Sequence, residues 1–136
     1  MIFFLSATDP ATRACAERIS QMGEQYKKKP LFLLALSVNR GESLHDLKAL
    51  GDRYDWDLPI YRDVDQNIAK GLKVGQTTQV LILSRGVVRY SGALDDCWFD
   101  QRLVNDRSAA RAADALMAGS PVLNPEPGYY SGEAIK

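Results

Sequence analysis

The chain has 136 residues, of which 46% are hydrophobic and 25% charged, with 17 Lys and Arg against 17 Asp and Glu. This size and this mixture are typical of one folded domain and exclude a wholly disordered chain. The balanced charge excludes the basic excess that nucleic-acid binders need, and no apolar stretch reaches the ~20 residues needed for membrane insertion.

The first third of the sequence predicts a strand followed by a helix. Residues 2–7 form a short apolar run. Thr8 or Asp9 can then cap a helix in which Pro10 occupies the first position. An apolar stripe at helical spacing is formed by Cys15, Ile19, Met22 and Tyr26. The opposite, polar side is formed by Glu17, Arg18, Gln21 and Glu24.

The middle of the chain predicts a buried strand and two further helices. Residues 31–38 are almost continuously apolar, as in a strand covered on both faces. The next helix presents the apolar side chains of Leu44, Leu47, Leu50 and Tyr54. After a short extended piece at 58–61, we expect Asp65 to cap a brief helix that buries Ile68 and Leu72.

The last third predicts a hairpin, a helix and a tail. Residues 79–83 and 87–90 are rich in strand-forming side chains, and the turn between them contains glycine. A final helix starts near Asn105 or Asp106 and stops at Gly119.

This order of elements predicts the fold class. A strand, a helix and a second strand form a parallel unit with a right-handed crossover, and the hairpin adds antiparallel strands. We therefore expect an α/β protein whose central mixed sheet has four strands, or slightly more, with helices on both faces. The domain spans residues 1–120, and a C-terminal tail rich in Pro and Gly spans 121–136.

Five stretches carry a more specific signal, namely residues 3–13, 36–43, 58–63, 80–83 and 86–96. Their sequences and order resemble the peroxiredoxin-like redoxins, the alkyl hydroperoxide reductase and thiol-specific antioxidant family. The resemblance implies a thioredoxin-like fold and redox chemistry at the turn into the first helix. In such proteins two cysteines flank two residues at that turn, and a cis-proline faces them.

The chain departs from this family at the redox site itself. Asp9 and Thr12 stand where the resemblance places the two cysteines, and Thr78 stands in place of the cis-proline. We expect the bond before Thr78 to be trans, because a non-proline cis bond costs about 3–4 kcal/mol. Thiol-disulfide exchange needs a thiolate, and none can form at this turn. The sequence therefore predicts a redox-inactive thioredoxin-like domain that acts by binding or as a structural module. The expected contact surface is a groove lined by Asp9, Pro10, Thr12, Thr77 and Thr78.

The two cysteines leave an alternative open. Cys15 lies on the apolar stripe, where a free cysteine is usually a small buried hydrophobe. It could instead be a displaced nucleophile, with Cys97 as its partner, in a divergent thiol-disulfide oxidoreductase or thiol peroxidase. A disulfide between the two requires their Cα atoms to come within ~7 Å.

Other candidate residues have a structural and a functional interpretation, and we favour the structural one for each. Asp95 and Asp96 are expected to form a turn or cap rather than a hydroxyl- or metal-binding pair. His45 is expected at the surface. Arg13 is expected to be solvated, although it could hold an anion beside the start of the first helix. Four aromatic residues could anchor loops or form an interface, namely Trp98, Phe99, Tyr129 and Tyr130.

The sequence also bounds cofactors, partners and compartment. Two cysteines are too few for a disulfide framework or a zinc site, and we expect no metal and no cofactor. Residues 1–5 lack the basic flank of a signal peptide. We expect a soluble protein, cytoplasmic unless a leader preceded this chain, in which case it would be exported or periplasmic. Its expected partners are other proteins or further domains of a longer chain.

Overall fold

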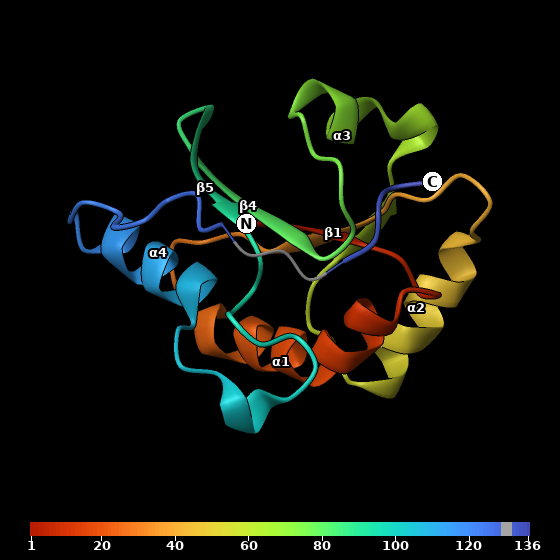
Figure 1. Ribbon diagram of the computed structural model, residues 1–136, viewed down its shortest axis with the longest axis horizontal. Helices are drawn as coiled ribbons and strands as arrows, with labels where there is room; N and C mark the ends of the chain where they lie inside the picture. The colour runs from red at the N-terminus through yellow and green to blue at the C-terminus, as the bar shows by residue number, and fades with distance from the viewer. Residues whose placement is uncertain (129–131) are drawn as a thin grey trace.

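A five-stranded mixed sheet forms the centre of the computed structural model, which describes residues 1–128 and 132–136 (Figure 1). The strands are β1 (Ile2–Leu5), β2 (Leu34–Ser37), β3 (Ile60–Arg62), β4 (Gln79–Ser84) and β5 (Val87–Gly92), arranged in the order β3-β2-β1-β4-β5. β1 pairs in parallel with β2, which pairs in parallel with β3, whereas β4 is antiparallel to both β1 and β5. The α/β class and the mixed sheet predicted from the sequence are confirmed. The fifth strand is β3, which lies within and just beyond the expected extended piece.

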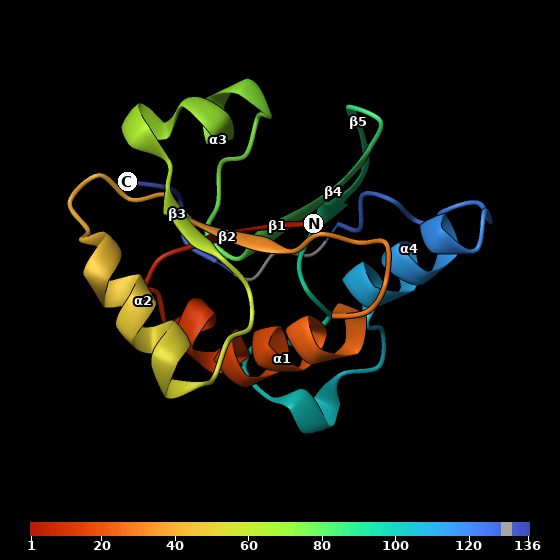
Figure 2. The ribbon, with the colours of Figure 1, turned by 180° about the vertical axis from the view of Figure 1, so that it is seen from behind.

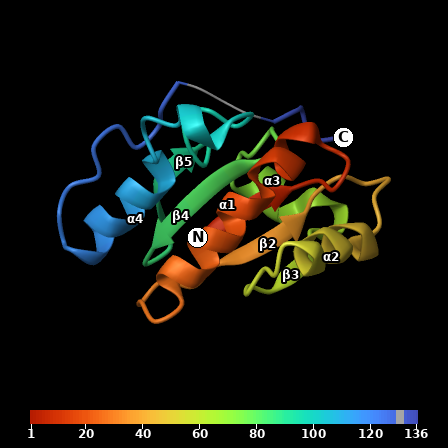
Figure 3. The ribbon, with the colours of Figure 1, turned by 90° about the horizontal axis from the view of Figure 1, so that it is seen from below.

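Helices cover both faces of this sheet, as expected. The helices are α1 (Pro10–Tyr26), α2 (Leu44–Arg53), α3 (Asn67–Gly71) and α4 (Ser108–Met117). Figures 1 and 2 show α1, α2 and α4 on one face and α3 on the other. Viewed from below, α1 crosses the middle of the sheet between α2 and α4 (Figure 3). α4 starts two to three residues later than the expected start near Asn105 or Asp106, and Arg107 occupies its cap position.

The larger core lies between the sheet and the three helices of that face. The predicted stripe of α1 is confirmed, because Cys15, Ile19, Met22 and Tyr26 are each at most 2% exposed. A smaller core under α3 comprises Phe4, Leu36, Val38, Ala69, Val74 and Leu81. β1 and β2 thus have core residues on both faces, which explains the apolar run where it coincides with β2. The expected strand at 31–38 is longer than the observed one, which spans Leu34–Ser37, and Phe32 before it is 65% exposed.

One assignment on α1 is wrong. The sequence pattern places Arg18 on the wet side of the helix, but its residue exposure is only 9%. Arg18 lies three positions after Cys15, so the two side chains are neighbours on the surface of α1. The guanidinium of Arg18 donates to the Trp98 carbonyl in the loop that follows β5, and this loop buries it.

The hairpin between β4 and β5 follows from its turn chemistry. Arg85 and Gly86 both adopt positive φ angles, 53° and 76°. Two such residues form the tight turn whose twist matches the flanking strands. The predicted hairpin is confirmed, and it carries one irregularity in register between Ile82 and Leu83.

The cap of α3 differs from the expectation. Asp65 is exposed and has a φ of 56°, whereas the carboxylate of Asp63 accepts hydrogen bonds from the amides of Ile68 (2.9 Å) and Ala69 (2.8 Å). Ile68 is 42% exposed, and Ala69 is the buried residue of the helix. The prediction that Asp65 caps this helix is therefore wrong. The tertiary fold buries Asp63 instead, and its carboxylate satisfies the first amides of α3.

Asp63→Ala is expected to lower the free energy of unfolding by about 1–3 kcal/mol, because the buried amide of Ala69 and the partly buried amide of Ile68 would lose their acceptor. Chemical denaturation monitored by circular dichroism measures this change. Asp65→Ala is the matched control, and it should have little effect because its side chain is exposed. Equal effects of the two substitutions would contradict the assignment of Asp63 as the cap.

In the part of the chain that the structure describes, every helix is too short or too polar to cross a lipid bilayer.

Candidate functional site

Four of the five expected site positions meet at the carboxyl end of β1. Asp9, Thr12, Thr77 and Thr78 are between 0% and 3% exposed, and only Pro10, the first residue of α1, is on the surface. The chain brings them together because the β1–α1 turn and the segment before β4 lie side by side. Thr12 fixes the turn from within α1, since its Oγ1 accepts a hydrogen bond from the Ser6 amide (3.3 Å).

Asp9 is the centre of this cluster. Its Oδ1 atom accepts the amide of Ala11 (2.8 Å), which makes Asp9 the N-cap of α1 as predicted. Its Oδ2 atom accepts a hydrogen bond from the Thr77 hydroxyl and another from the Glu133 amide (3.2 Å). A carboxylate at this position therefore satisfies donors from three separate parts of the chain.

The C-terminal segment 132–136 covers the cluster. Ala134 forms an antiparallel bridge with Gln76, and the Thr77 amide donates to the Glu133 carbonyl (2.9 Å). Gly132 passes so close to Thr77 that a Cβ atom there would collide with the Thr77 carbonyl. The sequence predicted an open contact groove here, but segment 132–136 occupies it. The Glu133 amide donates to Asp9, and the Glu133 carbonyl accepts from the Thr77 amide.

The same segment is held at its far end by polar groups that follow β2. Lys136 donates its amide to the Asn39 side chain (2.9 Å) and accepts from the Arg40 amide (2.9 Å). The buried side-chain amide of Gln66 donates to the carbonyls of Lys136 (2.9 Å) and Val38 (3.0 Å). The segment is thus bound along its whole described length.

Thr78 has a strained backbone. Its φ is 60°, in the left-handed region that costs a residue with a Cβ about 1–2 kcal/mol. The peptide bonds between described residues are all trans, as expected for Thr78. The Thr78 amide donates to the Phe4 carbonyl (2.6 Å), and its hydroxyl donates to the Thr77 carbonyl (2.6 Å). These bonds hold the strained residue at the start of β4.

A second polar cluster lies between α1 and the loop after β5. Arg18 Nε forms an ion pair with Asp95 Oδ2 at 2.9 Å, although without the alignment of a hydrogen bond. Arg18 Nη2 donates to the carbonyls of Cys97 (3.2 Å) and Trp98 (2.8 Å) and contacts Cys15 Sγ at 3.3 Å. Asp95 Oδ1 in turn accepts the Cys97 amide (3.2 Å). The sequence analysis named Cys15, Cys97 and Asp95 as candidates but missed Arg18, the residue that joins them, whose only signal was a cation three residues after a stripe position.

The thiol of the Arg18 cluster has a raised pKa. Burial raises the pKa of the Cys15 thiol to about 11, and the neighbouring Arg18 guanidinium only partly opposes this shift. Burial likewise raises the pKa of Asp95, against the opposing effect of Arg18. Cys15 and Cys97 form no disulfide with each other, and both are buried free thiols. Arg18 bridges the two residues, because its Nη2 atom contacts the Cys15 sulfur and the Cys97 carbonyl.

The remaining candidates have structural positions. Asp96 accepts the Asn105 amide (2.9 Å), and His45 is exposed. Trp98 packs against the larger core and meets Phe99 edge-on at 5.7 Å, while Phe99 itself is 64% exposed. Tyr129 and Tyr130 lie outside the described residues. Within residues 1–128 and 132–136, no group of three His, Cys, Asp or Glu side chains is placed to hold a metal ion.

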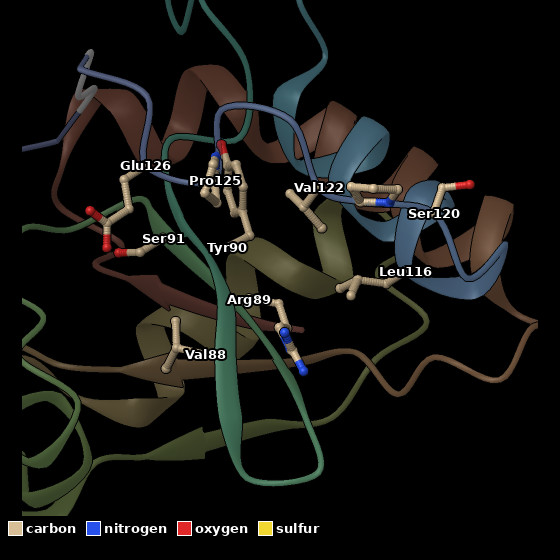
Figure 4. A pocket seen from close by; sticks show the side chains of 10 residues that line it. Val88, Arg89, Tyr90, Ser91, Leu116, Ser120, Val122, Pro125 and Glu126 are labelled. Carbon is tan, nitrogen blue, oxygen red and sulfur yellow. The ribbon is translucent and has the colours of Figure 1, made fainter.

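Two open grooves are lined by residues outside these clusters. One, of about 320 Å³, lies between β5 and residues 116–126 (Figure 4). Figure 4 shows Arg89 and Glu126 in this groove pointing in different directions, and the Tyr90 hydroxyl is already bound to Ala93 and Ser108. The other groove, of about 470 Å³, lies between the start of α1 and α2 and is lined by Arg13 and Arg53. Neither groove contains a cysteine.

Comparison with known proteins shows that solved structures share this fold. No protein-family model and no curated protein matches the sequence. A hypothetical protein from Sinorhizobium meliloti 1021 matches with a TM-score of 0.80 and 20% identity, over 98% of this chain and 75% of that one. An uncharacterized conserved protein from Geobacillus kaustophilus matches with a TM-score of 0.83 and 24% identity, over 99% of this chain and 75% of that one. The chain therefore shares its α/β fold with these two proteins over nearly its whole length.

Proposed function

We propose that this chain is a redox-inactive, thioredoxin-like module that acts by binding or by supporting other parts of an assembly. Its order of elements supports the thioredoxin-like assignment. The unit β1-α1-β2 is followed, after the insertion of α2 and β3, by α3, the β4-β5 hairpin and α4. The helices α1 and α4 lie on one face and α3 on the other, and β1 is central (Figure 2).

The observation that carries the proposal is the hydrogen bonding of Asp9. In the redoxins that this sequence resembles, the start of this helix carries a thiol whose thiolate is stabilised by the helix dipole. Here the same position holds a carboxylate that caps α1 and binds Thr77 and Glu133. A carboxylate cannot form a mixed disulfide or a sulfenic acid, so the position serves structure instead of redox chemistry.

Cys15 offers no substitute nucleophile in this arrangement. It is 2% exposed, and a pKa of about 11 leaves only about one thiolate in ten thousand near neutral pH. Attack on a disulfide or a peroxide needs both an accessible sulfur and its thiolate form.

The native protein is expected to show no reduction of insulin disulfides and no turnover of a hydroperoxide above the buffer rate. Iodoacetamide should label Cys15 and Cys97 in the native protein much more slowly than in the urea-unfolded protein, because both thiols are buried. Intact-protein mass spectrometry follows this labelling. Cys15→Ser and Cys97→Ser assign the sites one at a time.

The alternative, a divergent thiol-disulfide oxidoreductase or thiol peroxidase, makes the opposite prediction. Turnover in the native protein that disappears in Cys15→Ser or Cys97→Ser would establish it and overturn the proposal. Turnover unchanged in both variants would point to a contaminating activity, because the chain contains no other cysteine.

A further inference from the structure

A groove between the start of α1 and one side of α2 lies apart from both polar clusters. Its volume is about 470 Å³, and its walls include Thr8 from the β1–α1 turn and Arg13 from α1. From α2 and the residue after it come Asp46, Arg53 and Tyr54. Asp46 and Arg53 are seven positions apart, so they share one face of the helix. This spacing explains why both charged residues line the same groove.

The groove holds two guanidinium groups without acidic partners. Within the residues that the structure describes, neither Arg13 nor Arg53 belongs to an ion pair. Arg13 donates its Nε hydrogen to the Ala7 carbonyl (2.9 Å), which fixes the side chain against the β1–α1 turn. Its two Nη groups make no hydrogen bond to residues 1–128 or 132–136, and a guanidinium presents such donors in a planar fork suited to carboxylates and phosphates.

Arg53 is held by a different contact. Its guanidinium carbon lies 5.8 Å from the centre of the Tyr54 ring, within the range of a cation–π interaction. No hydrogen bond to another described residue occupies the N–H donors of Arg53, so they can bind a ligand. Two guanidinium groups with separate anchors thus line one groove.

Acidic groups near the groove limit how much negative charge it accepts. Asp46 lies in the wall, and Glu42 sits behind it, where its carboxylate accepts the Thr8 amide (3.1 Å). The wall residues therefore carry two positive charges and one negative charge. This balance favours a small ligand with one or two oxyanion groups over a nucleic acid or another polyanion.

We propose that this groove binds a small oxyanionic ligand, a carboxylate or a phosphate, through the guanidinium groups of Arg13 and Arg53. Because an aspartate shares the groove, a cationic group on the ligand would add to its affinity. The inference goes beyond the proposed function, since it concerns no residue of the Asp9 or Arg18 clusters.

Titration followed by two-dimensional NMR tests the proposal with two probes, inorganic phosphate and succinate, against chloride at equal ionic strength. Saturable shifts are expected for amides around Thr8 and Tyr54. Arg13→Gln and Arg53→Gln should each weaken binding about tenfold, which is the loss expected for one charge-assisted contact. Asp46→Asn should tighten binding a few-fold, because it removes a repelling charge from the wall.

Arg85→Gln is the matched control, since Arg85 lies in the β4–β5 turn and lines neither groove. It should bind both probes as the unmodified protein does. Phosphate and succinate together distinguish the two ligand chemistries, and stronger shifts with either one support the proposal. Shifts equal to those in chloride, or equal weakening by Arg85→Gln, would overturn it. Because Arg53 makes no hydrogen bond that supports the fold in the described residues, Arg53→Gln keeps the test valid even if Arg13→Gln fails to fold.

Discussion

Arg18→Met is expected to lower the free energy of unfolding by about 3–5 kcal/mol, the usual result of removing one partner from a buried ion pair. The substitution leaves Asp95 as a buried carboxylate without its cation. It also removes the donor to the carbonyls of Cys97 and Trp98, which hold the loop after β5 against α1. Methionine retains most of the side-chain volume, so the loss reflects charge and hydrogen bonding more than a cavity. Urea denaturation measures it.

The loss of stability in Arg18→Met should be larger at neutral pH than in mild acid. Burial already raises the pKa of Asp95, and Arg18 opposes that shift, so the pKa should rise further in Arg18→Met. A carboxyl group with a higher pKa in the folded protein than in the unfolded chain binds its proton more tightly when folded. Stability therefore falls as pH rises from the unfolded pKa through the folded one. The variant should recover part of its stability in mild acid, where Asp95 becomes neutral.

Two further variants separate this explanation from a general disruption. Arg18→Met combined with Asp95→Asn should be more stable than Arg18→Met alone near neutral pH, because no unpaired charge is then buried. Arg102→Met is the matched surface control, since it breaks an exposed ion pair with Asp100 and should change stability little. A pH-independent loss in Arg18→Met, unrelieved by the second substitution, would refute the role given to Asp95.

Asp9→Ala is expected to lower the free energy of unfolding by about 2–4 kcal/mol. The substitution removes the cap of α1 and takes one acceptor from both the buried Thr77 hydroxyl and the Glu133 amide. These two groups then keep the longer bonds between Thr77 and Glu133, at 3.1 and 3.3 Å. Asp9→Asn should lose less, because an asparagine oxygen still caps α1. Thermal denaturation ranks the two variants.

A second readout shows whether the C-terminal segment depends on Asp9. Limited proteolysis should cut the tail faster in Asp9→Ala than in Asp9→Asn or the unmodified protein. Gly132→Ala should produce the same faster cleavage with α1 still capped, because its methyl group would collide with Thr77. Unchanged cleavage in both Asp9→Ala and Gly132→Ala would mean that the tail is held by its other contacts alone.

The features that depend only on residues close together in the chain were predicted from the sequence. The cap at Asp9, the apolar stripe from Cys15 to Tyr26 and the β4–β5 turn each follow from side-chain chemistry within a few positions. The resemblance to redoxins pointed to Asp9, Thr12, Thr77 and Thr78, which the structure brings together.

Contacts between distant residues could not be predicted in this way. Arg18 is a polar residue by pattern, and only the loop after β5 explains its burial. Asp63 and Asp65 are equivalent candidates until the sheet determines which of them is buried. The Arg13 and Arg53 groove requires α1 and α2 to lie on the same face, a matter of packing that spacing along the chain does not reveal.

The bond between the Asp9 carboxylate and the Glu133 amide joins residues 124 positions apart. A contact of such separation closes a long loop, and that entropic cost favours its formation after the nearer pairings of the sheet. Substitutions in segment 132–136 should then accelerate unfolding while leaving the rate of folding nearly unchanged. The same reasoning makes this segment a candidate for subglobal opening, in which Asp9 and Thr77 meet water while the five strands stay paired.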